Sequence, residues 1–207
     1  MKDVQKLLKE IREYGEKNDV PISKEDTLNF LLTTIKENKC KQVLEIGTAI
    51  GYATIAFAFL DCVKQVESVE KDENRFNLAL ENIEKSGLKS KITIYNMDAK
   101  IFLQNNEKTY DFIYLDGPKG QYINYLPYLL KMLNKNGILV ADNLFFHGMV
   151  TGEIPVTKGC KSMIKGLKNY IQEITTNPNL ETKILNIGDG LGITKLLSQK
   201  EKIKKKK

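Results

Sequence analysis

Three residues in the second half of the chain offer hard oxygen ligands in a pattern that suits a metal ion. Asp116 follows the apolar segment Phe112–Leu115, and Asp142 and Asn143 follow the apolar segment Ile138–Ala141. Carboxylate and amide oxygens suit Mg²⁺, Mn²⁺ or Ca²⁺ rather than zinc, and three protein ligands leave positions for water and substrate oxygens. We therefore predict a divalent-metal site at these residues. A turn or a helix cap is the alternative for each residue taken singly.

Lys119 stands three residues after Asp116, at a predicted helix start, where the helix dipole disfavours its positive charge. A nearby dication disfavours the ammonium form further, which makes a neutral, proton-accepting amine more accessible. Such an amine can act as a general base that removes a hydroxyl proton while the oxygen attacks a methyl group. The competing interpretation is a solvated surface lysine. The single histidine, His147, has no second histidine for a zinc site and is interpreted as a loop residue on the substrate side.

A second set of residues has the pattern of a nucleoside-binding turn. The segment VLEIGTAIGY is an apolar strand that runs into a glycine turn and then a helix. Gly47 and Gly51 let a ligand approach the backbone closely near a helix N-terminus. Their GxxxG spacing lacks the pyrophosphate signature GxGxxG and the Gly-Lys-Ser/Thr of a P-loop. A turn without phosphate handling, entered through Glu45, suits a nucleoside that carries an amino acid, and a tight turn without a ligand is the alternative.

Acidic residues close the next two predicted strands. Glu70 comes about 25 residues after the glycine turn, where a carboxylate can accept hydrogen bonds from both hydroxyls of a ribose. Asp98 and Ala99 close the third strand, beside the expected place of an adenine ring. The carboxyl ends of parallel strands share one edge of a doubly wound sheet, so we expect these residues and the metal ligands at the same crevice.

The hydrophobic pattern alternates between short β-rich runs and helical stretches. The predicted strands are Gln42–Ile46, Gln65–Val69, Ile92–Asn96, Phe112–Leu115 and Ile138–Ala141, and the helices between them are Tyr52–Leu60, Asn74–Ser86, Ala99–Gln104 and Gln121–Leu133. Five such units predict an α/β fold with a doubly wound, Rossmann-like parallel sheet and helices on both faces. Gly87 and Gly137 stand where a turn or helix C-cap would need a positive φ.

The two ends of the chain add to this pattern. Thr182–Ile187 and Leu191–Leu196 predict a terminal hairpin, which makes a seven-stranded, mostly parallel sheet with one antiparallel strand. Two helices precede the sheet, and Ser23 followed by Asp26 predicts the N-cap of the second. We predict a single domain over residues 1–207, with an N-terminal helical extension over 1–38 and a basic tail over 198–207.

The composition limits the class of protein. Of the 207 residues, 42% are apolar and 28% charged, as in ordinary globular proteins. No apolar run is long enough for a membrane span, and the three cysteines form no CxxC pair, so we expect reduced thiols and a cytoplasmic location. The net charge is +6, of which Lys200–Lys207 supplies six lysines and one glutamate. That tail is interpreted either as a solvated end or as an electrostatic arm for RNA.

Together these motifs resemble the metal-dependent, catechol-type O-methyltransferases, family 3 of the class I methyltransferases. The resemblance covers nearly the whole chain and lies in LEIGTAIGYA, SVEKDENR, NMDA, IYLDGPKGQY and LVADNLFFHGMV. It implies S-adenosylmethionine as the methyl donor, Asp116, Asp142 and Asn143 as metal ligands, and Lys119 as the catalytic base. The cofactor-binding residues that we predict are Ser23, Glu45, Gly47, Gly51, Tyr52, Ala53, Glu70, Asp98, Ala99 and Asp116.

One position departs from the family pattern. Ala53 stands where relatives usually carry a serine that binds the methionine carboxylate, so a backbone N–H or Thr54 would have to take that role. Within the family, NDVPISKED, the DNLFFHG loop and GDGLGITK are most similar to bacterial tRNA 5-hydroxyuridine methyltransferases. This similarity implies a tRNA substrate, a product with 5-methoxyuridine at wobble position 34, Mg²⁺ as a cofactor beside S-adenosylmethionine, and a homodimer.

Three alternatives stay open. The first is an O-methyltransferase of small catechol or caffeoyl-type phenols, which would share the catalytic residues. The second is a nicotinamide-dependent oxidoreductase, against which the missing GxGxxG argues. The third is a non-catalytic RNA-binding module on the same scaffold, against which the intact set of metal ligands and lysine argues.

Overall fold

The structure is a computed structural model that describes residues 2–197, so the basic tail predicted over 198–207 lies outside the described residues. Its contacts divide the chain into two compact units, with the boundary between Asn106 and Glu107. The helices and strands of the first unit are α1 (Lys2–Lys17), α2 (Glu25–Glu37), β1 (Gln42–Ile46), α3 (Tyr52–Phe59), β2 (Gln65–Glu70), α4 (Glu73–Ser86), β3 (Ile92–Asn96) and α5 (Ala99–Asn105). Those of the second are β4 (Tyr110–Leu115), α6 (Tyr122–Lys131), β5 (Leu133–Ala141), α7 (Lys161–Thr176), β6 (Leu180–Leu185) and β7 (Leu191–Leu196).

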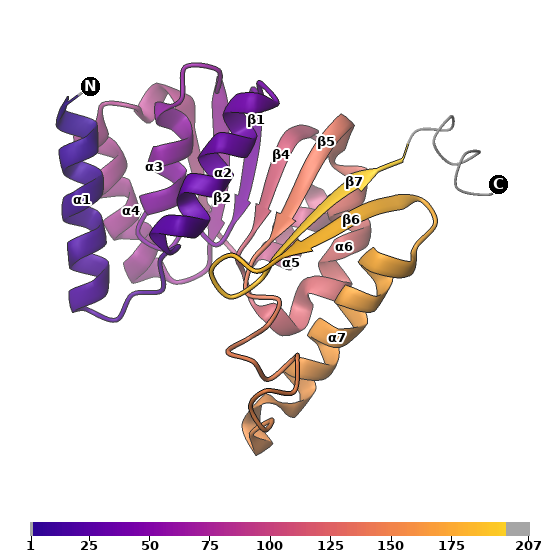
Figure 1. The fold of residues 1–207 in the computed structure, drawn as a ribbon. Helices are drawn as coiled ribbons and strands as arrows, with labels where there is room; N and C mark the ends of the chain where they lie inside the picture. The colour runs from indigo at the N-terminus through magenta and orange to yellow at the C-terminus, as the bar shows by residue number, and fades with distance from the viewer. Residues whose placement is uncertain (1, 198–207) are drawn as a thin grey trace. The chain divides into compact units, whose positions relative to one another are not determined.

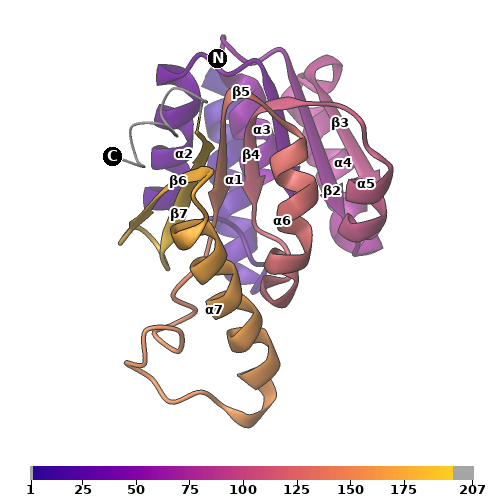
Figure 2. The same ribbon diagram turned by 90° about the vertical axis from the view of Figure 1, so that its right-hand side faces the viewer.

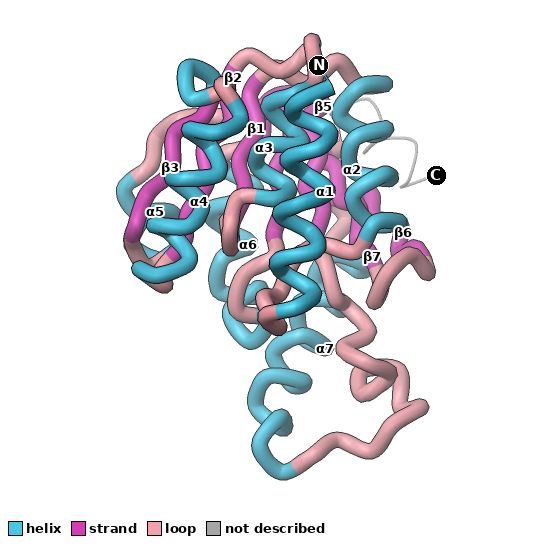
Figure 3. Tube along the Cα trace, turned by 90° about the vertical axis from the view of Figure 1, so that its left-hand side faces the viewer, coloured by secondary structure: helices cyan, strands magenta, loops and turns pink. Residues whose placement is uncertain are grey.

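The first unit is built on three parallel strands. β1 pairs with β2, Val43 opposite Val66, and β2 pairs in turn with β3, while α3 and α4 pack on these strands. Seven of the eight residues of α3 are buried, which explains its almost uninterrupted apolar sequence. Helix α1 lies outside α3 and α4 and buries the stripe Val4, Leu7 and Ile11 against them (Figure 1, Figure 3).

The second unit combines parallel and antiparallel pairing. β4 and β5 run parallel, while β7 pairs antiparallel with both β5 and β6, as the predicted terminal hairpin requires. Helices α6 and α7 pack against each other, and α7 also lies beside β6 (Figure 2). The strand order of the whole sheet is β3-β2-β1-β4-β5-β7-β6. The predicted fold class, seven strands with one antiparallel strand and surrounding helices, is confirmed.

Two local predictions are wrong. Helix α2 has Lys24 rather than Ser23 at its N-cap, because the Lys24 carbonyl accepts the first helical hydrogen bond, from Leu28 N–H at 2.9 Å. Gly137 does not take a positive φ: it lies within β5, and its neighbour Asn136 adopts the left-handed conformation at φ 67°. Asparagine tolerates that region, whereas a Cβ on Gly137 would lie 2.9 Å from the Asn134 carbonyl oxygen.

The remaining glycine prediction is confirmed. Gly87 ends α4 in the left-handed conformation with φ 68°, as a C-cap glycine does.

The expected helical extension over 1–38 contains α1 and α2, and the assignment of residues 1–207 to a single domain stays a prediction. Within residues 2–197, no helix is long and apolar enough to span a membrane.

Candidate functional site

The glycine turn between β1 and α3 is a compact backbone structure at the carboxyl end of β1. Gly47 and Gly51 have φ values of 109° and 86°, which L side chains rarely adopt, and Ala49 between them has a φ of 46°. The N–H groups of Gly47 and Thr48 both donate to the carbonyl of Val69, at 3.0 and 3.2 Å. The turn is therefore attached to the end of β2, and Gly51 occupies the N-cap of α3.

Glu70 connects the end of β2 to this turn. The residue is 9% exposed, and its two carboxylate oxygens accept from the N–H groups of Ala49 at 2.9 Å and Asp72 at 2.8 Å. Each carboxylate oxygen retains accepting capacity after one such bond. A ribose hydroxyl could therefore bind to Glu70 without displacing the bonds that hold the carboxylate in place.

Asp98 is joined to the same region. The N–H of Met97 donates to the Glu70 carbonyl at 3.1 Å, and Asp98 follows directly as the N-cap of α5. Its carboxylate accepts from the N–H of Lys100 at 2.9 Å and pairs with Lys71 at 3.1 Å. The bond from Lys100, followed by that from Lys71, lowers the pKa of Asp98, so this carboxylate is a fixed anion beside Ala99.

The carboxylate of Glu45 has internal partners. Glu45 is 1% exposed and accepts hydrogen bonds from the hydroxyls of Thr54 and Ser68, the latter at 2.7 Å, while Ser68 also bonds to Thr48 at 2.6 Å. This hydrogen-bond network connects Thr48 of the turn to side chains of β1, β2 and α3. It also corrects the suggested role of Thr54, whose hydroxyl is buried and directed at Glu45 rather than available in place of a serine at Ala53.

Tyr52 and Ala53 open α3, and both are buried. Burial is the main cause that raises the pKa of Tyr52, and the guanidinium of Arg12 partly opposes it. Ser23, in the segment before α2, is buried at 8% exposure. The structure thus brings Gly47, Gly51 and Glu70 into one hydrogen-bonded group, with Asp98 joined to it. Contact with the cofactor stays a prediction for all the residues named for that role, including Glu45 and Asp116.

In the second unit, two of the predicted metal ligands converge on one tyrosine. The hydroxyl of Tyr114 lies 2.7 Å from Asp142 Oδ2 and 3.5 Å from Asp116 Oδ2. The N–H of Asp142 donates to the Leu115 carbonyl at 3.0 Å, which aligns the ends of β4 and β5. Asn143 follows in the left-handed conformation at φ 57° and donates its N–H to Asp142 Oδ1 at 2.6 Å.

The electrostatics of this pair suit a bound cation. Asp142 is 4% exposed, and burial, followed by the negative charge of Asp116, raises its pKa to about 6. Two crowded carboxylates and a neighbouring amide are a donor set that a divalent cation would neutralise. Among residues 2–197, no group of three or more His, Cys, Asp and Glu side chains could hold a metal. A metal would therefore need the Asn143 amide and water as further ligands, and the metal site stays a prediction.

Lys119 lies against the same carboxylates. It opens a 3₁₀ turn, Lys119–Gln121, its side chain is 15% exposed, and its ammonium pairs with Asp116 and lies 5.6 Å from the centre of the Tyr122 ring. Tyr122 is fully buried and donates its hydroxyl to the Leu115 carbonyl at 3.0 Å. Burial, followed by the charges of Asp116 and Asp142, raises the pKa of Tyr122 well above its usual value, so its hydroxyl stays a donor. This setting argues against a solvated surface lysine.

Sequence reasoning missed Tyr114. A signal was present, because side chains two residues apart in a strand share a face, which places Tyr114 on the side of Asp116. The sequence also gave no partner for His147. The side chain of His147 is exposed, but its backbone N–H donates to both carboxylate oxygens of Asp189, at 2.9 and 3.1 Å. The loop is further fixed by bonds from Leu144 N–H to Gly190 and from Phe145 N–H to Asp189, at 3.0 and 2.9 Å.

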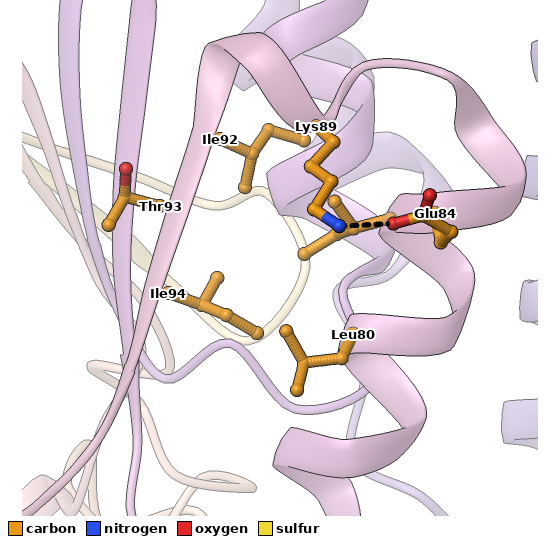
Figure 4. Close-up of a pocket in the computed structure, with 7 residues that line it drawn as sticks. Leu80, Glu84, Lys89, Ile92, Thr93 and Ile94 are labelled. Carbon is orange, nitrogen blue, oxygen red and sulfur yellow. Dashed lines mark hydrogen bonds and ion pairs between the residues drawn. The ribbon is translucent and has the colours of Figure 1, made fainter.

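A pocket of about 390 Å³ lies elsewhere in the first unit, between α4 and β3. Its walls are mostly apolar. Two of the residues that line it, Lys89 and Glu84, form an ion pair with 2.7 Å between Lys89 Nζ and Glu84 Oε2 (Figure 4). None of the predicted site residues lines it. The residues around it are Leu80, Ile83, Glu84, Lys89, Ile92, Thr93 and Ile94.

Comparison with known proteins supports the reading of these motifs. The sequence profile of the O-methyltransferase family matches residues 2–197. The chain belongs to this family. Tapetum-specific methyltransferase 1 of Arabidopsis thaliana is 30% identical over 203 residues, with 92% of this chain and 86% of that protein covered. Caffeoyl-CoA O-methyltransferase 1 of the same plant is 28% identical, with 92% and 78% covered.

Solved O-methyltransferase structures agree. A provisionally named caffeoyl-CoA O-methyltransferase from Staphylococcus aureus is 31% identical, with a TM-score of 0.83 and 90% of each chain covered. An O-methyltransferase from Bacillus cereus in complex with SAH has the same fold, with a TM-score of 0.80 at 21% identity over 93% of this chain and 91% of the other. The resemblance to family 3 is thereby confirmed.

Proposed function

We propose that this O-methyltransferase transfers the methyl group of S-adenosylmethionine to the 5-hydroxyl of 5-hydroxyuridine at the wobble position of tRNA, giving 5-methoxyuridine. The observation that carries the reaction class is the cluster of Asp116, Asp142, Tyr114 and Lys119, in which a lysine lies against crowded carboxylates at two strand ends. The tRNA acceptor rests on the motif similarity of the sequence.

The donor is expected to bind through the first unit. The Glu70 carboxylate is preoriented by two backbone N–H groups and would accept the ribose hydroxyls. Asp98 and Ala99, joined to β2 through Met97, would lie beside the adenine. The SAH-bound B. cereus relative supports a cofactor of this class.

The second unit would supply the chemistry at the acceptor. When bound, a divalent cation at Asp116, Asp142 and Asn143 would lower the pKa of an acceptor hydroxyl. Lys119, whose side chain pairs with Asp116, would accept the hydroxyl proton on its Nζ once that nitrogen has given up a proton to solvent. Tyr114 keeps the Asp142 carboxylate in place by its hydrogen bond. The acceptor oxygen would attack the methyl carbon in line, so that the O–C bond forms as the C–S bond of the sulfonium breaks and S-adenosylhomocysteine leaves as a neutral thioether.

The acceptor chemistry fits 5-hydroxyuridine. Its O4 carbonyl and 5-hydroxyl are vicinal oxygens, spaced like those of a catechol, so both can approach the same carboxylate-lined position. A wobble base is unpaired in free tRNA and can be splayed out of its loop. The partly exposed Phe145 and Phe146 would be candidates for stacking, whereas Tyr122 is fully buried. The second candidate function, methylation of catechol or caffeoyl-type phenols, is favoured by the name of one plant relative, caffeoyl-CoA O-methyltransferase 1.

Parallel assays with each acceptor distinguish the two candidate functions. Purified protein, S-adenosylmethionine and Mg²⁺ are incubated with tRNA carrying 5-hydroxyuridine, with caffeoyl-CoA or with a catechol, and products are identified by mass spectrometry. We expect 5-methoxyuridine from the tRNA. Inert tRNA together with efficient methylation of a phenol would replace the tRNA proposal with the phenol one. The homodimer is proposed on the same resemblance and is checked by light scattering.

A further inference from the structure

Four lysines form a row along the solvent side of α7 and the turn before it. Lys158 lies in a 3₁₀ turn, Lys158–Cys160, and Lys161, Lys165 and Lys168 lie in α7. All four are exposed. Their spacing of three, four and three residues places the three helical lysines on one face of α7. We call these four residues the α7 lysine row.

The row is not balanced by acidic residues. The sequence contains no Asp or Glu between Glu153 and Glu173, so no carboxylate stands three or four residues from Lys161, Lys165 or Lys168. Within residues 2–197, no member of the row takes part in an ion pair or a hydrogen bond of its side chain.

Helix α1 shows the ordinary arrangement. There Lys6 pairs with Glu10 and Lys9 with Glu13, each at 3.8 Å. Like charges at positions i and i+4 of a helix destabilise it. The α7 lysine row therefore carries unrelieved repulsion, which an anionic partner would remove.

The other side of α7 lies against the turn that carries the catalytic lysine. The helix buries Ile164, Leu167, Tyr170 and Ile174. A Cβ on Gly166 would lie only 2.9 Å from the Gly120 carbonyl oxygen, and one on Gly120 only 3.4 Å from Met163 Cα. The backbone of α7 is thus in direct contact with the residue after Lys119. A helix with its side chains is about 10 Å across, so the row is separated from the Lys119 turn by about one helix thickness.

The shape and chemistry of the row favour a polymer of phosphates. Lys161 to Lys168 extend over about 10 Å of helix at 1.5 Å per residue, and the turn with Lys158 lengthens the row. The side chains stand on the exposed side of a helix and line none of the described pocket. Lysine offers a point charge without the fixed fork of arginine, which suits phosphates met in varying register.

We propose that the α7 lysine row is the surface that binds the phosphate backbone of the acceptor tRNA and holds its loop beside the Lys119 turn. This inference rests on the proposed tRNA methyltransferase function. The partner is an RNA backbone rather than the few phosphates of a small molecule, which a concave site would enclose. Binding of this kind releases counterions and weakens steeply with salt.

The test compares two full-length variants that lose the same formal charge. In the row variant, Lys161, Lys165 and Lys168 are each replaced by glutamine. In the control variant, Lys6, Lys9 and Lys17, which are exposed residues of α1, are replaced in the same way. The Kd for tRNA is measured by fluorescence anisotropy from 50 to 200 mM salt. Circular dichroism melting checks that all proteins fold.

We expect the row variant to reduce the slope of log Kd against log salt by about 2 to 3, since each lost phosphate contact contributes about 0.7 to 0.9. Its kcat/KM for tRNA should fall at least tenfold, with an unchanged Kd for S-adenosylmethionine. The control should behave as wild type. Equal losses in both variants, or no loss in the row variant while wild type methylates tRNA, would refute the role of the α7 lysine row. Neither result would contradict the proposed tRNA acceptor. A wild type that neither binds nor methylates tRNA would overturn the proposed acceptor as well.

Discussion

Replacing Asp142 by asparagine should stabilise the metal-free protein while it removes metal binding. Asp142 is 4% exposed, and its pKa is raised from 3.8 to about 6 because the ionised carboxylate is buried beside Asp116. Each pKa unit corresponds to about 1.4 kcal/mol, so the shift corresponds to a destabilisation of about 3 kcal/mol at neutral pH. Asparagine keeps the shape without the charge but weakens the hydrogen bonds from Tyr114 and Asn143.

We therefore expect a net gain of about 1–2 kcal/mol, or about 2–8 °C in Tm for a protein of this size. The pH dependence has a defined sign. The folded protein holds more protons at Asp142 than the unfolded chain between pH 4 and pH 6, so wild type gains stability as the pH falls through that window. The advantage of Asp142→Asn should be largest above pH 6 and disappear below pH 4.

The assay is thermal unfolding in EDTA at pH 7.5, 6 and 4, with Asp61→Asn, at an exposed position, as the control. A second series adds Mn²⁺ at pH 7.5, which should raise the Tm of wild type and not that of Asp142→Asn. A variant that is less stable than wild type at pH 7.5 in EDTA, or whose gain persists at pH 4, would refute the role given to the buried charge.

Three further predictions concern the reaction. Glu70→Ala should weaken S-adenosylmethionine binding by about 1–3 kcal/mol in calorimetry, because hydrogen bonds to a charged acceptor are lost, and an unchanged affinity would show that the ribose binds elsewhere. Lys119→Ala should lower turnover by about 10²–10⁴-fold with a near-normal cofactor Kd, and normal turnover would exclude its role as base. EDTA should abolish wild-type turnover until Mg²⁺ or Mn²⁺ is restored, and Asp116→Ala should stay inactive; full activity in EDTA would contradict the metal proposal.

Much of the fold could be predicted because its signals are local. β1, β3 and β7 have the predicted bounds, and each of these runs begins directly after a lysine or a glycine. The start of β5 could not be predicted in this way. The helical pattern of α6 continues to Leu133, but that residue already begins β5, where Asn134 bonds to Asp111 at 2.8 Å and the pairing with β4 shifts register. A partner 23 positions away leaves no trace in the local hydrophobic pattern.

The candidate site, too, could be predicted only in part from the sequence. Acidic residues at strand ends identified Glu70, Asp116 and Asp142 as side chains at the carboxyl edges of their strands. The partners that orient them could not be read from spacing, because they come from other elements or from the backbone. Glu45 illustrates the limit: a strand-end carboxylate suggested a ligand contact, yet its described bonds brace the turn through Thr54 and Ser68.

The loop after Asp142 has a consequence for the order in which this protein matures during synthesis. Leu144, Phe145 and His147 donate their backbone N–H groups to Asp189 and Gly190, which are more than 40 positions later in the chain. β5 likewise gains its antiparallel neighbour only with β7. When β4 and β5 have emerged from the ribosome, the nascent chain already contains Asp116 and Asp142. It still lacks Asp189 and Gly190, which hold the segment that begins at Asn143. The segment can be anchored only after the hairpin of β6 and β7 has emerged, so this part of the protein is completed only once β7 has been synthesised.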